Sequence, residues 1–263
     1  MEVIIRPDAD AACKLAARLI ADAVAANPKL VLGLATGRTM ERLYGLMAEL
    51  HAAGQLDLSR AQSFNLDEYI GLAPEHPDSY RTYMETHLFS RVNIHPGNTH
   101  LPNGAASDLD RECALYEERI QAAGGIDLQL LGIGRSGHIG FNEPLSAMRS
   151  RTRCKALTPE TIAQNSPLFP EPSLMPRRAI TMGVGTILDA KRCLMLVTGE
   201  EKAAILAKAV EGPITSMISA TALQLHPKCT VIIDEAAASK LEQRDYYRWI
   251  FENEPEWDAY RNL

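Results

Sequence analysis

The sequence predicts an α/β fold in which a mostly parallel sheet carries helices on both faces, within a single domain covering residues 1–263. Short apolar runs of strand length alternate with longer segments of helical periodicity along the whole chain. Several of these runs are apolar at every position, as is typical of parallel strands buried on both faces. No repeat, linker or low-complexity tract divides the chain, and its length suits one α/β domain.

The first half of the chain contains three predicted strands and three predicted helices. The first helix has apolar residues at helical spacing and stops at Asn27 and Pro28, because proline cannot continue a helix. The next one stops at Gly54. The patterns predict strands over 3–5, 30–34 and 63–66, and helices over 8–26, 41–53 and 79–89.

The second half continues the same alternation. A long helix over 108–123 ends at two glycines and is followed by a buried strand over 126–133. Further strands are expected over 179–182, 194–197 and 229–233, with helices between and after them. Four prolines crowd the segment around 160–177, which predicts an irregular, mobile lid.

Composition excludes several classes of protein. The chain has 27 basic and 33 acidic residues, a formal charge of −6, which argues against nucleic acid as the main partner. No apolar run approaches the ~18 residues of a membrane span, and no secretory signal is visible, so we expect a cytoplasmic protein without a membrane partner. Its five scattered cysteines favour reduced thiols over disulfides, and none has metal-ligand spacing, so no metal is expected.

The first candidate site follows the strand over 30–34. Thr36, Gly37, Arg38 and Thr39 lie between this strand and a helix, where backbone N–H groups and the helix dipole favour an anion. The alternative is an ordinary turn with a threonine cap. Lys202, in the first turn of a later helix, opposes the dipole there, so it is either a solvated surface lysine or a lysine aimed at an anion.

The second candidate site follows the strand over 63–66. Asp67 and Glu68 emerge where ligands of an open parallel sheet bind. One of them could act as a general base with a pKa set by partial burial. The spacing alone favours the other interpretation, a strand end whose acids face water.

The third candidate site is the glycine-rich segment 131–144, which follows a buried strand. It contains a literal G-x-G-x-x-G, but the segment breaks at Pro144 and a basic region follows, which argues against a dinucleotide site. The glycines let the backbone approach a ligand closely. His138 lies among them, and with Glu143 it could form a pair for proton transfer.

A basic stripe follows this segment. Arg149, Arg151, Arg153 and Lys155 alternate strictly, so in an extended conformation all four would point to one face. The stripe is either a charge-protected edge strand or a second anion site.

Taken together, these segments resemble the glucosamine-6-phosphate deaminase family over essentially the whole chain. The strongest matches are Phe-Asn-Leu-Asp-Glu-Tyr at 64–69 and Gly-His-Ile-Gly-Phe-Asn-Glu-Pro at 137–144. The resemblance implies a modified Rossmann-like fold. It also implies a hydrolase acting on a carbon–nitrogen bond, which converts glucosamine 6-phosphate and water to fructose 6-phosphate and ammonia without a metal or organic cofactor.

The resemblance also implies residue roles. Asp67 would move a proton from C2 to C1 through an enolamine, and His138, supported by Glu143, would open the sugar ring. Thr36, Gly37, Arg38, Thr39 and Lys202 would hold the phosphate. Many members are hexamers activated by N-acetylglucosamine 6-phosphate, so the resemblance implies a homo-oligomer, with Ser146, Arg153 and Lys155 matching part of the effector site.

Three positions depart from the family pattern. Arg38 stands where the family usually has glycine, and Ser136 stands where an aspartate often acts with the histidine in ring opening. Pro167 stands where an arginine usually helps to bind the substrate phosphate. The alternatives left open are the same chemistry on galactosamine 6-phosphate, a sugar-phosphate lactonase of similar fold, and a non-catalytic sugar-phosphate sensor.

Overall fold

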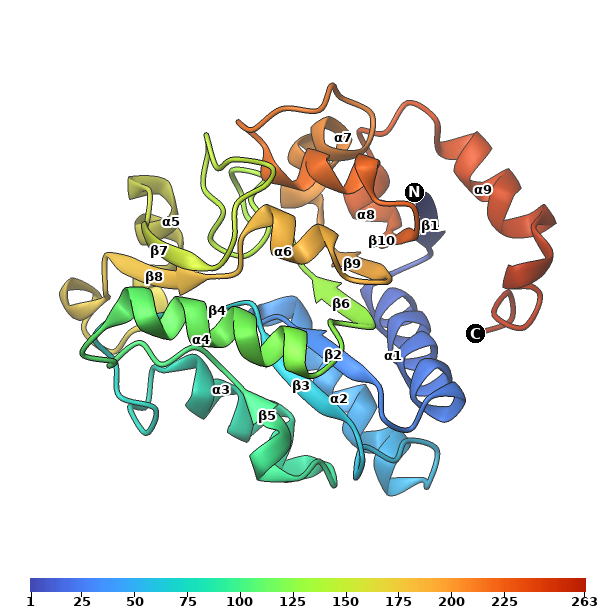
Figure 1. The fold of residues 1–263 in the computed structure, drawn as a ribbon. Helices are drawn as coiled ribbons and strands as arrows, with labels where there is room; N and C mark the ends of the chain where they lie inside the picture. The colour runs from blue at the N-terminus through green and yellow to red at the C-terminus, as the bar shows by residue number, and fades with distance from the viewer.

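The computed structural model describes residues 1–263 and contains two sheets (Figure 1). The main sheet is entirely parallel, with the order β1-β10-β9-β6-β2-β3-β5. Its strands are β1 Glu2–Arg6, β10 Cys229–Asp234, β9 Cys193–Val197, β6 Leu128–Leu131, β2 Val31–Leu34, β3 Gln62–Asn65 and β5 Thr99–His100. The predicted parallel sheet is therefore confirmed.

Helices cover both faces of this sheet. Helices α1 (Ala9–Ala26) and α2 (Arg38–Ala52) pack against each other, while α4 (Leu109–Ala122) and α6 (Val184–Leu188) lie in front of the sheet in Figure 1. The remaining helices are α3 Tyr80–His87, α5 Pro159–Asn165, α7 Ala203–Val210, α8 Glu235–Ala238 and α9 Arg244–Asn253. Most of the core is one cluster of 61 buried hydrophobic residues, and a separate cluster of 7 includes Tyr69 and Phe141.

A second, antiparallel sheet corrects the expectation for residues 179–182. Strand β8 (Arg178–Thr181) does not join the parallel sheet but pairs with β4 (Asp67–Tyr69) and β7 (Arg153–Ala156). Leu66 links the two sheets, because its N–H donates to Leu34 of the main sheet and its carbonyl accepts from Met182. The chain thus leaves the main sheet immediately before Asp67.

The chain reverses direction across the sheet between β2 and β6. It runs from β1 through β2 and β3 to β5, returns to β6 beside β2, and then continues outward to β9 and β10. Loops from adjacent strands diverge at such a reversal and leave a crevice outside their carboxyl ends, where ligands of open α/β sheets bind. The turn after β2, which contains Gly37, and the histidine loop after β6 both lie there.

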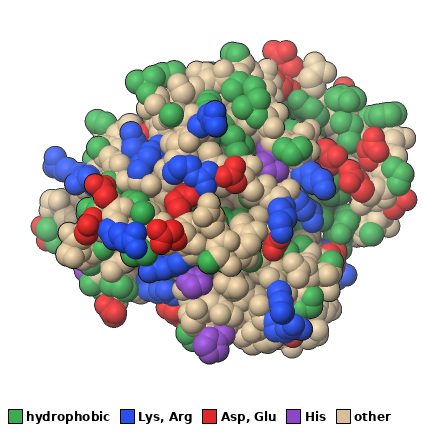
Figure 2. Space-filling model, viewed as in Figure 1, with side chains coloured by type: hydrophobic (Ala, Val, Ile, Leu, Met, Phe, Trp, Pro, Cys, Tyr) green, Lys and Arg blue, Asp and Glu red, His purple; other side chains and the backbone are tan.

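None of the helices combines the length and the apolarity that crossing a bilayer requires. The face shown in Figure 2 carries basic and acidic side chains interspersed. All five cysteines are free; four are buried and Cys154 is partly buried, as expected for reduced thiols.

Candidate active site

Asp67 is the buried carboxylate at the junction of the two sheets. It opens β4 opposite Thr181 of β8 and is 6% exposed. Burial, reinforced by the neighbouring charge of Glu68, raises the pKa of Asp67 to about 8. Once ionised, a carboxylate with such a pKa is a stronger base than an exposed aspartate, which suits the general base expected at this position.

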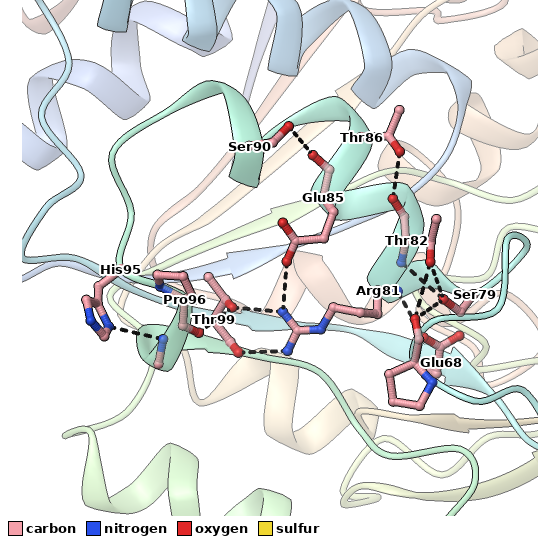
Figure 3. Close-up of polar contacts among 12 residues, drawn as sticks. Glu68, Ser79, Arg81, Thr82, Glu85, Thr86, Ser90, His95, Pro96 and Thr99 are labelled. Atoms are coloured by element: carbon pink, nitrogen blue, oxygen red, sulfur yellow. Dashed lines mark hydrogen bonds and ion pairs between the residues drawn. The ribbon is translucent and has the colours of Figure 1, made fainter.

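The carboxylate of Glu68, the next residue, contacts the start of a helix. Its carboxylate accepts hydrogen bonds from the backbone N–H groups of Tyr80 at 2.9 Å and Arg81 at 3.0 Å, in the first turn of α3 (Figure 3). A carboxylate at a helix N-terminus satisfies free N–H groups and complements the helix dipole. Of the two acids that the sequence offered as bases, Glu68 therefore anchors α3, and Asp67 remains available for chemistry.

Helix α3 also forms hydrogen bonds to two other segments near the site. The Arg81 guanidinium donates to the hydroxyl and the carbonyl of Thr99, which fixes α3 against β5 (Figure 3). The Tyr83 hydroxyl donates to the carbonyl of Gly37 at 2.8 Å. One short helix thereby joins the acidic segment to the glycine turn after β2.

His138 lies in a compact loop with both of its expected partners. Its Nδ1 is 3.1 Å from a carboxylate oxygen of Glu143 and 2.8 Å from the hydroxyl of Ser136. Burial raises the pKa of Glu143, but hydrogen bonds from His138, Thr161 and the Thr158 backbone outweigh it and lower the pKa to about 2. The ionised Glu143 therefore orients the ring and leaves Nε2 for a ligand.

The glycines of this loop make room for its side chains. A Cβ on Gly134 would overlap the His138 ring at Nε2. Gly140 has a φ of +54°, and a Cβ there would lie 2.9 Å from the Thr181 hydroxyl and 3.4 Å from a carboxylate oxygen of Asp67. The loop after β6 thus passes directly over Asp67, which brings the histidine and the acid into one site.

The predicted anion turn lies at the start of α2. The helix begins at Arg38, three residues before the predicted position, and is preceded by Gly37 with a φ of 120°. The Thr39 hydroxyl lies 3.4 Å from that of Thr198, which follows β9, while Thr36 is partly buried beside α3. Free backbone N–H groups, two hydroxyls and the exposed Arg38 make this turn suitable for a phosphate.

Lys202 closes the same site from the β9 side. It ends a 3-10 turn, Glu200–Lys202, rather than lying in the first turn of a helix as predicted; α7 begins at the next residue. Lys202 is partly buried, and burial, with the nearby positive charge of Arg135, lowers its pKa. The proximity of Arg135 to Lys202 could not be predicted from the sequence, because the two residues follow different strands.

The basic stripe does not form a single face, which corrects that expectation. Only Arg153 and Lys155 lie within β7, an edge strand. Arg151 forms ion pairs with Glu117 of α4 and Asp189. Arg153 donates to the Asn142 side-chain oxygen at 2.8 Å and to the buried Ser146 hydroxyl at 3.0 Å, while Lys155 makes no hydrogen bond or ion pair.

Comparisons with known proteins agree with this arrangement. The family profile described as glucosamine-6-phosphate isomerases/6-phosphogluconolactonase matches residues 8–232. A glucosamine-6-phosphate deaminase of Hahella chejuensis is 49% identical over 95% of this chain and 95% of its own length. One from an Arthrobacter species is 47% identical over 98% of this chain and 100% of its own.

Two solved structures are also similar. A monomeric glucosamine-6-phosphate deaminase superposes with a TM-score of 0.89 at 42% identity, covering 91% of this chain and 100% of that one. A 6-phosphogluconolactonase of Trypanosoma cruzi gives a TM-score of 0.73 at 20% identity, covering 92% of this chain and 97% of its own. The second likeness shows the fold alone.

Proposed function

This chain belongs to the family of glucosamine-6-phosphate isomerases and 6-phosphogluconolactonases, and we propose that within it the chain is a glucosamine-6-phosphate deaminase. The observation that carries this proposal is the near-full-length identity of 47–49% to deaminases, against 20% to a lactonase of the same fold. The reaction converts glucosamine 6-phosphate and water to fructose 6-phosphate and ammonia.

In the proposed mechanism His138 opens the sugar ring. Its Nε2 is free because Nδ1 faces the ionised Glu143, so the imidazole exchanges a proton between the ring oxygen and the C1 hydroxyl. The Ser136 hydroxyl lies within hydrogen-bond distance of the same Nδ1, at the position where the family often has an aspartate. Ser136 thus supports the ring orientation without adding a second charge.

Asp67 then carries the isomerisation. Its carboxylate takes the proton from C2 of the open-chain sugar and delivers it to C1, which passes the substrate through an enolamine. The resulting C2 imine is hydrolysed by water, which releases ammonia and leaves the ketose. The pKa of about 8 makes Asp67 a stronger base than an exposed aspartate, because burial disfavours its charge.

The phosphate is assigned to the turn of Thr36, Gly37, Arg38 and Thr39, with Lys202 facing it. The segment around 160–177 is proposed as a lid. Asn165 donates to the Tyr69 hydroxyl at 3.2 Å, and the Phe169 ring packs on Tyr69 with 5.5 Å between centroids. Tyr69 lies two residues after Asp67 on β4, so these contacts support a lid next to the base.

Ser146, Arg153 and Lys155 are proposed as part of an effector site for N-acetylglucosamine 6-phosphate. Arg153 contacts Asn142, next to Glu143, so an anion bound at this site would act directly on the histidine loop. A homo-oligomer, up to a hexamer, is proposed as the assembly, and light scattering with and without the effector tests it.

The test of the proposed function is an ammonia-release assay on three substrates. Glucosamine 6-phosphate should yield ammonia, with galactosamine 6-phosphate run alongside to measure the preference between epimers. Hydrolysis of 6-phosphogluconolactone should be negligible. Lactone hydrolysis without ammonia release from either amino sugar would refute the proposal.

A further inference from the structure

Three basic side chains follow three adjacent strands of the main sheet. Strands β9, β6 and β2 are neighbours in that order, and Lys202, Arg135 and Arg38 follow them at the carboxyl ends. None of the three side chains makes a hydrogen bond or an ion pair within the protein. Ten other lysines and arginines of this chain form ion pairs, and Arg6 and Arg153 donate hydrogen bonds.

Arg135 occupies the middle of this row, at the crevice where the chain reverses between β2 and β6. Its positive charge lies close enough to Lys202 to affect the titration of that lysine. The charge of Glu201 acts on Lys202 in the opposite sense, but Glu201 forms no ion pair with Lys202 or Arg135. The two positive charges repel each other, and an anion between them would remove the repulsion. The pair of Arg135 and Lys202 is therefore better suited to contact a ligand group with two negative charges than to contact solvent alone.

The backbone fixes Arg135 relative to His138. The N–H of Gly137 donates to the carbonyl of Gly134 at 3.0 Å, so Arg135 and Ser136 are the two central residues of a tight turn. The N–H of Gly134 also donates to the carbonyl of His138 at 2.9 Å. The backbone of Arg135 is thus held at a set position relative to that of His138.

We propose that Arg135 binds the substrate phosphate together with Lys202, and supplies the arginine that the family usually carries where this chain has Pro167. An arginine fork matches phosphate oxygens in two places, whereas a lysine offers one point charge. Arg135 is exposed and follows β6, which lies between β2 and β9, the strands that precede the glycine turn and Lys202. This inference rests on the proposed function for the identity of the ligand, but not for the presence of an anion site.

Calorimetry with inorganic phosphate at fixed ionic strength tests the proposal. Arg135→Ala should raise the Kd for phosphate by about ten- to a hundredfold, and Arg135→Lys should fall between that variant and the wild type. Arg60→Ala is the matched control, because Arg60 is exposed ahead of β3 at the opposite edge of the sheet. It removes the same charge and should leave the Kd unchanged.

Steady-state ammonia release provides the second readout. The loss in Arg135→Ala should appear mainly in KM for glucosamine 6-phosphate, because the interaction is with a part of the substrate that does not react. If Arg135→Ala binds phosphate as the wild type does, or Arg60→Ala weakens it equally, the proposal is overturned. A wild type that binds phosphate through Arg135 but releases no ammonia would instead refute only the deaminase assignment.

Discussion

His138 Nδ1 lies 3.1 Å from the carboxylate of Glu143, which follows it by five residues in the same loop. The carboxylate is nearly inaccessible to solvent, yet its pKa is about 2, because hydrogen bonds from the ring and from the start of α5 outweigh burial. The pair therefore stays fixed, with Glu143 ionised, over the whole range in which an enzyme of this kind works.

Glu143→Gln should lower the free energy of unfolding at pH 7 by about 1–3 kcal/mol. The folded-state pKa lies below the usual value of about 4.3, so the stabilisation is present above pH 4.3 and is lost as the pH falls towards 2. Urea unfolding of both proteins from pH 2 to 7 measures this. The exposed Glu160→Gln is the control, and a pH-independent difference would contradict the assignment.

Gly134→Ala should reduce kcat by about 10²–10⁴-fold, the usual contribution of a positioned acid–base group. The added methyl group would overlap the His138 ring and displace Nε2. Gly132→Ala is the matched control in the same loop, because its methyl group would meet only the terminal methyl of Met40 at 3.4 Å. Equal kinetics for the two variants, with unchanged circular dichroism, would show that the ring position is unimportant.

Above pH 8, the free energy of unfolding should be higher for Asp67→Asn than for the wild type. The folded-state pKa of Asp67, about 8, is raised above its unfolded value of about 4. The folded protein therefore binds this proton more tightly, and stability decreases as the pH rises from 4 to 8. Denaturation at pH 4 and pH 9 tests the sign; a variant that is less stable at pH 9 would contradict the burial argument.

Lys155→Ala and Arg153→Ala should separate regulation from catalysis. Lys155 has no partner in the protein, so its loss should reduce only the response to N-acetylglucosamine 6-phosphate, a coupling of about 1–3 kcal/mol. Arg153→Ala should also lower kcat, because Arg153 holds Asn142 beside Glu143. Activity measured with and without the effector distinguishes the two, and equal effects of both variants would argue against this division.

The sequence predicted six of the seven strands of the main sheet, mostly from short apolar runs, but it did not reveal β5, a strand of two polar residues. It did not reveal β4, where Asp67 and Glu68 occupy a strand of three residues that no apolar pattern marks. The antiparallel sheet was missed for this reason. Whether β4 extends the main sheet or leaves it depends on the pairing with β8, more than 100 residues away.

The candidate site was also predicted only in part. His138 and Glu143 are close in sequence, so their pairing could be anticipated from spacing. Glu68 could not be distinguished from Asp67, because its partners are backbone N–H groups in a helix 12 residues further on. Arg135 was visible in a glycine-rich loop, but its approach to Lys202 depends on β6 and β9 lying side by side.

The most direct test of this account compares product formation by the wild type and Asp67→Asn, with phosphate binding measured in parallel. The wild type should release one ammonia for each fructose 6-phosphate formed. Asp67→Asn should lose about 10²–10⁴-fold of this turnover while binding inorganic phosphate as the wild type does. An Asp67→Asn variant that keeps more than half of the turnover would contradict the central claim that Asp67 moves the proton.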